Sequence, residues 1–513
     1  MSGLRLGRRA FVHLAALGGA AAALPRWLRA GILEAEGGLP PGILTGARVP
    51  PSSAGIDPVR VRGRVDVGDR GLPGVSVSDG LSVVRTGADG SFELVASPGA
   101  EFVFVTVPAG FEIPRNRAGT ARFYEPLRPD PRGEQAVRFS LAPRPLDDAS
   151  HALLLLADIQ TLDAEDMRRF HEETVPDVQA TVRSLGGIPA FGVSCGDIMY
   201  DRLELYPEYE RGVGRMGIPF FQVVGNHDLD QAARSDEAST ATFSRHFGPR
   251  YYSFDRGAVH YVVLDDVFWH GAGYLGYLDA RQLAWLEADL AHVTPGRPVV
   301  VMLHIPVLGS GHLREGRDRP ELGVAVTNRE ALYRLLEPYA AHVLAGHTHE
   351  NDHGFEGGVH EHVAGTVCGA WWTGPICWDG TPNGYAVYEA RGEEILWRYK
   401  ATGADASEQL RVYAAGAEPG APDEIVANVW DHDPEWTIVW YEDGDRRGEM
   451  SRRVGLDPMS VRLHAGPEIP PKHTWVDPVR TRHLFYAPVR PNAAVTVEAT
   501  DRFGRVYAAA PSA

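Results

Sequence analysis

The chain has 513 residues, of which 44% are hydrophobic and 23% charged, a composition typical of globular proteins. This length exceeds what one compact core supports, so we expect two to four domains. The formal net charge is −17, and no basic run occurs in the body of the chain, which argues against a nucleic-acid partner. No interior stretch is long and apolar enough to predict a transmembrane span.

Residues 1–30 are typical of an export signal. Arg8-Arg9-Ala10-Phe11-Val12 precedes an apolar run of small residues from Leu14 to Leu24, which is too short to cross a bilayer. Twin arginines followed by a large apolar residue resemble a twin-arginine signal. We therefore expect an exported protein, periplasmic, surface-held or secreted, without an integral membrane span once the signal is removed. An uncleaved anchor is the alternative interpretation of this run.

The next segments predict a linker and a first domain. Residues 31–56 are rich in Pro, Gly and Ala and are typical of a linker. Short alternating strands separated by turn signals follow over 57–145 and predict a β-sandwich. The run from Gly74 to Phe92 resembles small sandwiches of the transthyretin or carboxypeptidase-regulatory type, for which we expect a positioning role.

Strands and helices alternate over 146–405, which predicts an α/β domain. Strands return without helices between them over 420–513 and predict a third, all-β domain. The apolar strands expected in the central domain cover 153–157, 190–195, 220–224, 299–303 and 341–345.

Five short polar motifs stand where apolar strands end. The carboxyl ends of strands in α/β folds gather distant residues into one crevice, and glycine allows the backbone to turn sharply as it leaves the sheet. We therefore expect the polar side chains to converge. The motifs are Ala157-Asp158-Ile159-Gln160, Gly196-Asp197-Ile198-Met199-Tyr200-Asp201, Gly225-Asn226-His227-Asp228, Leu303-His304 and Gly346-His347-Thr348-His349.

The side chains of these motifs form a coherent set of metal ligands. A mixture of carboxylate, amide and imidazole groups suits Mn, Fe, Zn or Ni better than Ca or Mg alone. His347 and His349 can reach neighbouring ions, and Asp197 can bridge two cations through its two oxygens. Taken singly, Asp158 is typical of a helix cap and His304 of a core histidine, but five motifs in this order favour two divalent or transition metal ions.

The order of the motifs resembles that of the calcineurin-like metallophosphoesterase superfamily: Asp-x-His, GDxxD or GDxxN, GNHD or GNHE, a lone His, and GHxH. The resemblance covers about residues 150–400, and the flanking strands resemble a three-domain branch of that family. It implies an α/β fold, a four-layer αββα sandwich flanked by two all-β domains. It also implies a metal-dependent phosphoric ester hydrolase.

The resemblance further implies a role for each ligand. One residue departs from the family pattern, because Gln160 stands where the family usually has histidine. An amide oxygen is a weaker, neutral ligand, and Gln160 alternatively holds a metal-bound water. The implied ligands are Asp158, Gln160 and His349 for the first metal, Asp197 for both metals, and Asn226, His304 and His347 for the second.

The implied mechanism is attack of a metal-bound hydroxide on phosphorus, in line with the leaving oxygen. His227 is not needed as a ligand, so we expect it to face the leaving group as the proton donor. Its neighbour Asp228 is expected to fix the imidazole tautomer and to raise the pKa of His227. The substrate is expected to be a small phosphomonoester or phosphodiester, or a cell-envelope component, whereas the oligomeric state stays unknown.

A rival hypothesis is a non-catalytic surface adhesion or scaffold protein whose phosphoesterase domain has decayed. The nearly complete ligand set and the presence of His227 argue against it. A protein-phosphatase role is a third hypothesis, against which the export signal argues.

Other residues leave alternatives open. The polar segment after the last motif favours a solvated β-hairpin over further metal ligands, since polar loop residues are usually exposed. Cys368 and Cys377 either pair in an oxidising compartment or remain free thiols. The tryptophans at 371, 372 and 378 either line the substrate pocket or pack against the C-terminal domain. The polar segment comprises Glu350, Asp352, His353, His360 and His362.

Overall fold

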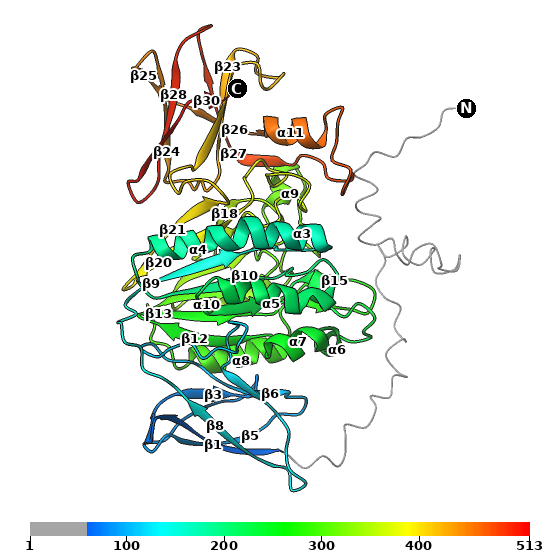
Figure 1. Cartoon of the computed structure of the whole chain (residues 1–513), viewed down its shortest axis with the longest axis vertical. Coiled ribbons are helices and arrows are strands. Elements are labelled where there is room, and N and C mark those ends of the chain that lie inside the picture. The colour runs from blue at the N-terminus through cyan, green and yellow to red at the C-terminus, as the bar shows by residue number, and fades with distance from the viewer. Residues whose placement is uncertain (1–58, 513) are drawn as a thin grey trace, which may run out of the picture.

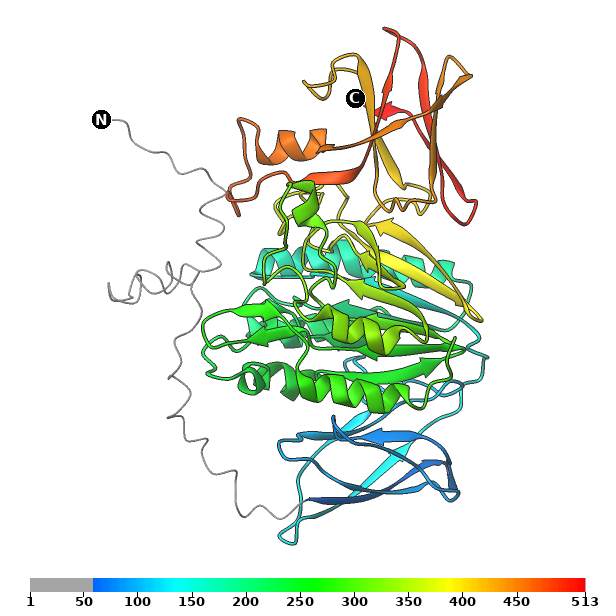
Figure 2. The same ribbon diagram turned by 180° about the vertical axis from the view of Figure 1, so that it is seen from behind.

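The structure, a computed structural model, describes residues 59–512. The predicted export signal at 1–30 and the linker at 31–56 lie outside the described residues. Three regions follow one another along the long axis of the molecule (Figures 1 and 2): a pair of small sheets, a central region of sheets and helices, and a C-terminal pair of sheets. Among the described helices, none is long and apolar enough to cross a membrane.

The N-terminal region contains two four-stranded sheets that share one apolar core. Side chains of β5 alternate between solvent and core, so Phe92 and Leu94 are buried between exposed neighbours. The first sheet contains β1 (Arg60–Val67), β2 (Arg70–Gly71), β5 (Ser91–Val95) and β8 (Glu134–Ser140). The second contains β4 (Val83–Arg85), β3 (Ser76–Ser78), β6 (Phe102–Val105) and β7 (Tyr124–Pro126).

The central region contains a five-stranded and a six-stranded sheet. Strands β9, β10 and β11 are parallel, as are β13, β16, β17 and β19, so the carboxyl ends of each set lie at one edge. The first sheet runs β11 (Phe220–Val223), β10 (Ala190–Cys195), β9 (Ser150–Leu156), β20 (Gly384–Arg391) and β21 (Glu394–Ala401). The second runs β12 (Tyr252–Arg256), β13 (Val259–Val263), β16 (Pro298–Met302), β17 (Ala340–Ala345), β19 (Val359–Val363) and β18 (Asp352–Glu356).

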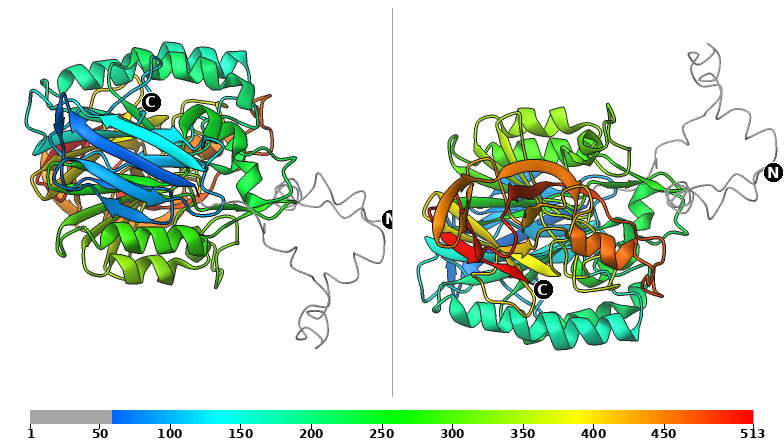
Figure 3. Two further views of the ribbon diagram at one scale, coloured as in Figure 1. Left: turned by 90° about the horizontal axis from the view of Figure 1, so that it is seen from below. Right: turned by 90° about the horizontal axis from the view of Figure 1, so that it is seen from above.

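Helices cover the two outer faces, so the layers run helix, sheet, sheet, helix (Figure 3). The covering helices are α3 (Ala164–Arg169), α4 (Val175–Ser184) and α5 (Tyr206–Arg215) on the first sheet and α8 (Ala280–Leu290) and α10 (Arg329–Leu336) on the second. The remaining elements are α6 (Asp236–Ser239), α7 (Ala241–Phe247), β14 (Val267–Trp269), β15 (Tyr274–Gly276) and α9 (Gly311–Arg314).

Strand β9 shows why the layers form. Its side chains point alternately to opposite faces of the sheet, and both faces are apolar. Leu153 and Leu155 belong to the core between the two sheets, whereas Leu154 and Leu156 pack with the helices outside the first sheet. A continuous run of leucines in this strand therefore requires apolar packing partners on both faces of the sheet.

The C-terminal region is a pair of sheets with one helix, α11 (Pro458–His464). Residues 465–479 follow this helix and reach back to the central region, where Lys472 Nζ lies 3.1 Å from Asp163 Oδ2. One sheet contains β26 (Ser451–Leu456), β27 (Arg480–Pro488), β23 (Glu424–Val429), β22 (Leu410–Tyr413) and β30 (Pro511–Ser512). The other contains β25 (Asp445–Glu449), β24 (Thr437–Glu442), β28 (Val495–Thr500) and β29 (Val506–Ala509).

The predicted fold class, a four-layer αββα sandwich flanked by all-β regions, is confirmed. The exact domain limits stay predictions. The expectation of a solvated hairpin after the last motif is wrong. Strand β19 lies inside the six-stranded sheet, between β17 and β18, and the side chain of His362 is only 2% exposed. Its ring packs against Trp397 of β21, with centroids 4.7 Å apart. One face of this hairpin is therefore part of the core between the two sheets.

His260 of β13 makes the stability of this core depend on pH. Its Nδ1 lies 2.9 Å from Asp255 Oδ1 and its Nε2 lies 3.0 Å from Asp289 Oδ2. Burial lowers the pKa of His260, but the charges of the two carboxylates outweigh burial and raise it from 6.5 to about 9. The proton is therefore bound more tightly in the folded state, and its contribution is complete below pH 6.5 and lost as the pH rises through 9.

We expect His260→Gln to lower the free energy of unfolding by about 3 kcal/mol at pH 6, because the buried charge pairing is lost. The gap between the wild-type and variant melting temperatures should shrink as the pH rises to 9.5. Thermal unfolding measured at several pH values, with exposed His292→Gln as the control, checks this. A gap that is constant with pH would contradict the pairing.

Candidate metal centre

The polar motifs converge at the carboxyl ends of parallel strands from both central sheets. Asp158 and Gln160 follow β9, and their neighbours in space come from four other strands. The side chains of Asp197, His304 and His347 place one ligand atom each within 4.8 Å of one another. Asp197 follows β10, Asn226 follows β11, His304 follows β16, and His347 and His349 follow β17.

Glycine precedes Asp197, Asn226 and His347 mainly because the loops approach one another closely. A Cβ atom on Gly225 would lie 2.0 Å from the backbone nitrogen of Asp197, which is an impossible contact. A Cβ atom on Gly196 would lie 2.2 Å from Nδ1 of His304, and this glycine also has a positive φ of 78°. Sharp turning, the reason expected from the sequence, therefore applies to Gly196, whereas lack of space explains Gly225.

The backbone of the centre is strained. Asp158, Gln160, Asp197, His347 and His349 all have positive φ angles, between 44° and 71°. Residues with a Cβ atom adopt this left-handed conformation at a cost of about 1–3 kcal/mol each and do so mainly at functional sites. Packing elsewhere in the domain therefore holds these side chains in place against their local preference.

Each histidine of the centre is oriented by a backbone carbonyl. Nδ1 of His304 lies 3.0 Å from the oxygen of Cys195, and Nε2 of His347 lies 2.8 Å from the oxygen of Gly323. In His349, Nδ1 lies 2.6 Å from a carbonyl oxygen. Because a carbonyl only accepts, these nitrogens carry a proton, and the other nitrogen of each ring faces the centre, where a bound metal would displace any proton on it. This is the usual arrangement of metal-binding histidines.

One half of the centre is formed by Asp158 and His349. Asp158 is fully buried, and its Oδ2 accepts a hydrogen bond from the backbone of His347 at 2.8 Å. Its Oδ1 has no hydrogen-bond partner within the described chain and lies 3.4 Å from Nε2 of His349. A buried carboxylate oxygen without a partner is costly unless a cation binds it, so these residues fit a metal ion.

The other half is formed by Asn226, His304 and His347. Nε2 of His304 lies 3.2 Å from Oδ1 of Asn226 and 3.2 Å from Nδ1 of His347. Three possible ligand atoms, Oδ1 of Asn226, Nε2 of His304 and Nδ1 of His347, therefore lie close together. These distances suit ligands that share one ion.

Asp197 lies between the two halves. Its Oδ1 is 3.3 Å from Nε2 of His304, and its Oδ2 accepts a hydrogen bond from Nε2 of Gln160 at 2.9 Å. Burial raises the pKa of Asp197, but the nearby histidines, His304 first, outweigh burial and lower it. The carboxylate is therefore ionised, and its two oxygens face different halves, as a bridging ligand requires.

Gln160 lies in the centre, but its amide nitrogen faces Asp197. A metal would need the amide oxygen, which lies 3.7 Å from the thiol of Cys368. Rotation of the amide plane by half a turn exchanges the two atoms without moving the chain. Gln160 is thus placed for either of the roles expected from the sequence.

His227 lies at the rim of the centre, with 24% of its side chain exposed. Its Nδ1 is 2.8 Å from Oδ1 of Asp201, and its ring stacks on Tyr200 with centroids 4.3 Å apart. Burial lowers the pKa of His227, but the charges of Asp197 and Asp201 outweigh burial and raise it to about 9. A protonated imidazole at this position can donate a proton.

The predicted role of Asp228 is wrong. Asp228 is fully buried and accepts three hydrogen bonds from backbone N–H groups and one from the hydroxyl of Tyr206. Within the described chain, none of its hydrogen bonds reaches His227. Asp228 therefore fixes one loop against another, and Asp201 orients the imidazole. The sequence did contain a signal, because Asp201 ends the segment that begins at Gly196, one residue later than in GDxxD.

Aromatic residues beside the centre were only partly predicted. Trp371 stacks on His349 with centroids 3.9 Å apart and contacts Trp475 of the 465–479 segment at 4.6 Å. Packing against the C-terminal region, one of the two alternatives, is therefore confirmed for Trp371, and a role in lining the substrate pocket stays a prediction. Cys368 lies 3.5 Å from Nδ1 of His349, and all three cysteines are buried free thiols.

Comparison with known families decides the identity of the fold. The chain matches the family models described as N terminal of Calcineurin-like phosphoesterase over 59–144, Calcineurin-like phosphoesterase over 152–351, and C terminal of Calcineurin-like phosphoesterase over 361–507. The chain belongs to the calcineurin-like phosphoesterase family. It is therefore a metal-dependent phosphoric ester hydrolase.

This phosphoesterase is similar to several known proteins. The serine/threonine-protein phosphatase CPPED1 of Bos taurus is 29% identical over 43% of this chain and 70% of the relative. Purple acid phosphatase 15 of Arabidopsis thaliana is 30% identical over 26% of this chain and 24% of the relative. The structure of purple acid phosphatase PPD1 from yellow lupin seeds is 14% identical, with a TM-score of 0.37 over 66% of this chain and 67% of that chain.

We expect Asp197→Ala to remove metal and activity together, because both halves of the centre lose a ligand. Turnover should fall by roughly a thousand-fold, since several kcal/mol of charge stabilisation are lost. Elemental analysis and turnover of the purified phosphoesterase check this, with Asp445→Ala, at a side chain 79% exposed, as the control. Full metal content in the Asp197→Ala protein would refute the bridging position.

Proposed function

We propose that this phosphoesterase is exported, holds two metal ions and hydrolyses small phosphomonoesters or phosphodiesters. The observation that carries the proposal is the position of Asp197 between two ligand groups. Asp158 and His349 lie on one side of it, and Asn226, His304 and His347 on the other. The orphaned oxygen of Asp158 and the inward-facing nitrogens of the histidines support two cations rather than one.

The ions would supply an activated water as the nucleophile and would neutralise the phosphate charge, for which the mixed ligands suit Mn, Fe, Zn or Ni. The chain itself supplies the leaving-group chemistry. His227 donates a proton to the leaving oxygen, and Asp201 holds the imidazole through Nδ1, so that Nε2 is free for the substrate. Stacking on Tyr200 fixes the plane of the ring.

The nearly complete ligand set argues against a decayed domain. Both curated relatives described above are named phosphatases, which supports hydrolysis of phosphate esters by this chain. Whether monoesters or diesters react faster is measured with p-nitrophenyl phosphate and its bis-ester. Absence of hydrolysis of both esters, after reconstitution with Mn or Zn, would refute the proposal.

The role of His227 is tested by varying the leaving group. We expect His227→Ala to keep its metals and to lower turnover of phenyl phosphate by about a hundred-fold or more. The loss should be much smaller with p-nitrophenyl phosphate, because nitrophenolate leaves without a proton. Asp201→Asn should follow the same pattern with a smaller loss. Equal losses on both substrates would mean that His227 is not the proton donor.

Export is supported by the Arg8-Arg9 pair and the short apolar run after it. We expect Arg8→Lys with Arg9→Lys to retain the protein inside the cell, because twin-arginine signals require both guanidinium groups. Activity in cell fractions, compared with that of the wild type, checks this. Unchanged distribution of activity would exclude this route.

A further inference from the structure

Four histidines lie on one face of the six-stranded sheet, away from the candidate metal centre. His342 of β17 is paired with His360 of β19, and His353 of β18 is paired with His362 of β19. Residues in register across neighbouring strands project to the same side, and so do residues two apart on one strand. All four side chains therefore enter the layer between the two sheets, where Trp397 of β21 faces them.

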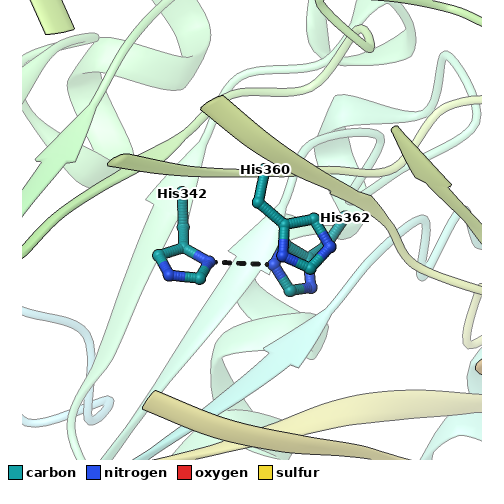
Figure 4. A group of neighbouring side chains, drawn as sticks. All are labelled: His342, His360 and His362. Carbon is teal, nitrogen blue, oxygen red and sulfur yellow. Dashed lines mark hydrogen bonds between the residues drawn. The ribbon is translucent and has the colours of Figure 1, made fainter. Parts of the chain in front are cut away.

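The rings of His360 and His362 stack with centroids 3.9 Å apart, and the ring of His342 faces them, as Figure 4 shows. Each offers one nitrogen, and the three nitrogens lie within 4.8 Å of one another. Nδ1 of His342 and Nε2 of His362 are 3.0 Å apart. Zn–N bonds of 2.0–2.1 Å in a tetrahedral site separate the ligand nitrogens by about 3.3 Å. The pair His342 and His362 therefore needs only a small shift, whereas the rings of His360 and His362 must open from their stack to share an ion.

Hydrogen bonding within the cluster leaves polar atoms without partners. Nδ1 of His362 is buried and makes no hydrogen bond to any residue in 59–512. Leaving such a group unpaired in a core costs about 1–3 kcal/mol, a cost that a ligand role for Nε2 of the same ring would offset. An apolar residue at this position would have avoided the cost.

The protonation state of the cluster suits metal binding. Burial lowers the pKa of His342 to about 4, and burial together with the neighbouring histidines lowers the pKa of His362 well below its usual range. Both imidazoles are therefore neutral at pH 7. Neutral imidazole is the form that binds a metal.

A chain of hydrogen bonds orients His360. Nε2 of His353 lies 2.9 Å from Oδ1 of Asp431, so in the neutral ring this nitrogen carries the proton and Nδ1 is an acceptor. Nδ1 of His353 lies 3.0 Å from Nε2 of His360, which therefore donates. The other nitrogen of His360 is then a lone pair. A carboxylate and an imidazole behind a histidine are typical of the surroundings of a metal ligand.

We propose that His342, His360 and His362 bind a divalent transition metal ion of the zinc class, separate from the candidate metal centre. Ligands that are all imidazoles favour Zn, Cu or Ni over Mg or Ca. The ion would join β17 to β19 in a region where Asp431 of the C-terminal region also bonds. Because β17 continues into His347 and His349, this site would also stiffen the strand that carries two residues of the candidate metal centre.

The test uses the full chain with the candidate metal centre disabled by Asp197→Ala and His304→Ala. After incubation with zinc and desalting, we expect one zinc ion per chain by elemental analysis. Adding His342→Gln and His362→Gln should lower the content at least ten-fold, whereas adding His292→Gln, at an exposed position, should not change it. Circular dichroism verifies that each variant is folded.

X-ray absorption at the zinc edge, measured on the chain with Asp197→Ala and His304→Ala, tests the proposal without any change to the histidine cluster. Scattering from three imidazoles at the usual Zn–N distance would support the proposal. A folded disabled chain without zinc, or zinc retained after the two glutamine substitutions, would overturn it. Hydrolysis by the wild type is independent of these outcomes, so failure here is distinguishable from failure of the proposed function.

Discussion

The carboxylate of Asp197 is buried between two ligand groups, each of which has members from both central sheets, and its two oxygens face one group each. The strands that carry the other ligands must meet this requirement. Asp197 and Gln160 follow strands of the first sheet, and His304 and His347 follow strands of the second. The sandwich must therefore place the carboxyl edges of the two sheets next to each other. The apolar core between the sheets therefore determines the geometry of the centre, although it contributes no ligand.

Strain in the loops follows from the same requirement. Asp158, Asp197 and His347 adopt left-handed backbone angles, and close approach excludes a side chain at Gly225. Asp228 stabilises these loops, since its carboxylate accepts hydrogen bonds from backbone N–H groups of the loop of Asp197 and of its own loop. A residue of the GNHD motif thus supports the ligands without touching the reaction.

The C-terminal region contacts the surroundings of the candidate metal centre rather than standing apart. Its 465–479 segment places Trp475 against Trp371, which covers His349, and Lys472 bonds to Asp163. Its Asp431 also reaches the histidine cluster between the sheets. Both connections end beside β17 or the loop after it, so that this strand joins the candidate metal centre, the cluster and the C-terminal region.

The sequence by itself determined the family, the order of the layers and the set of candidate ligands, because each motif is local and follows an apolar strand. Tertiary structure alone decided which groups meet across those motifs. It paired His227 with Asp201 instead of its chain neighbour Asp228, because the loop of Asp228 turns that carboxylate toward backbone N–H groups. It also buried His360 and His362, which are polar by composition, because β19 is an inner strand whose face is covered by a sheet distant in sequence.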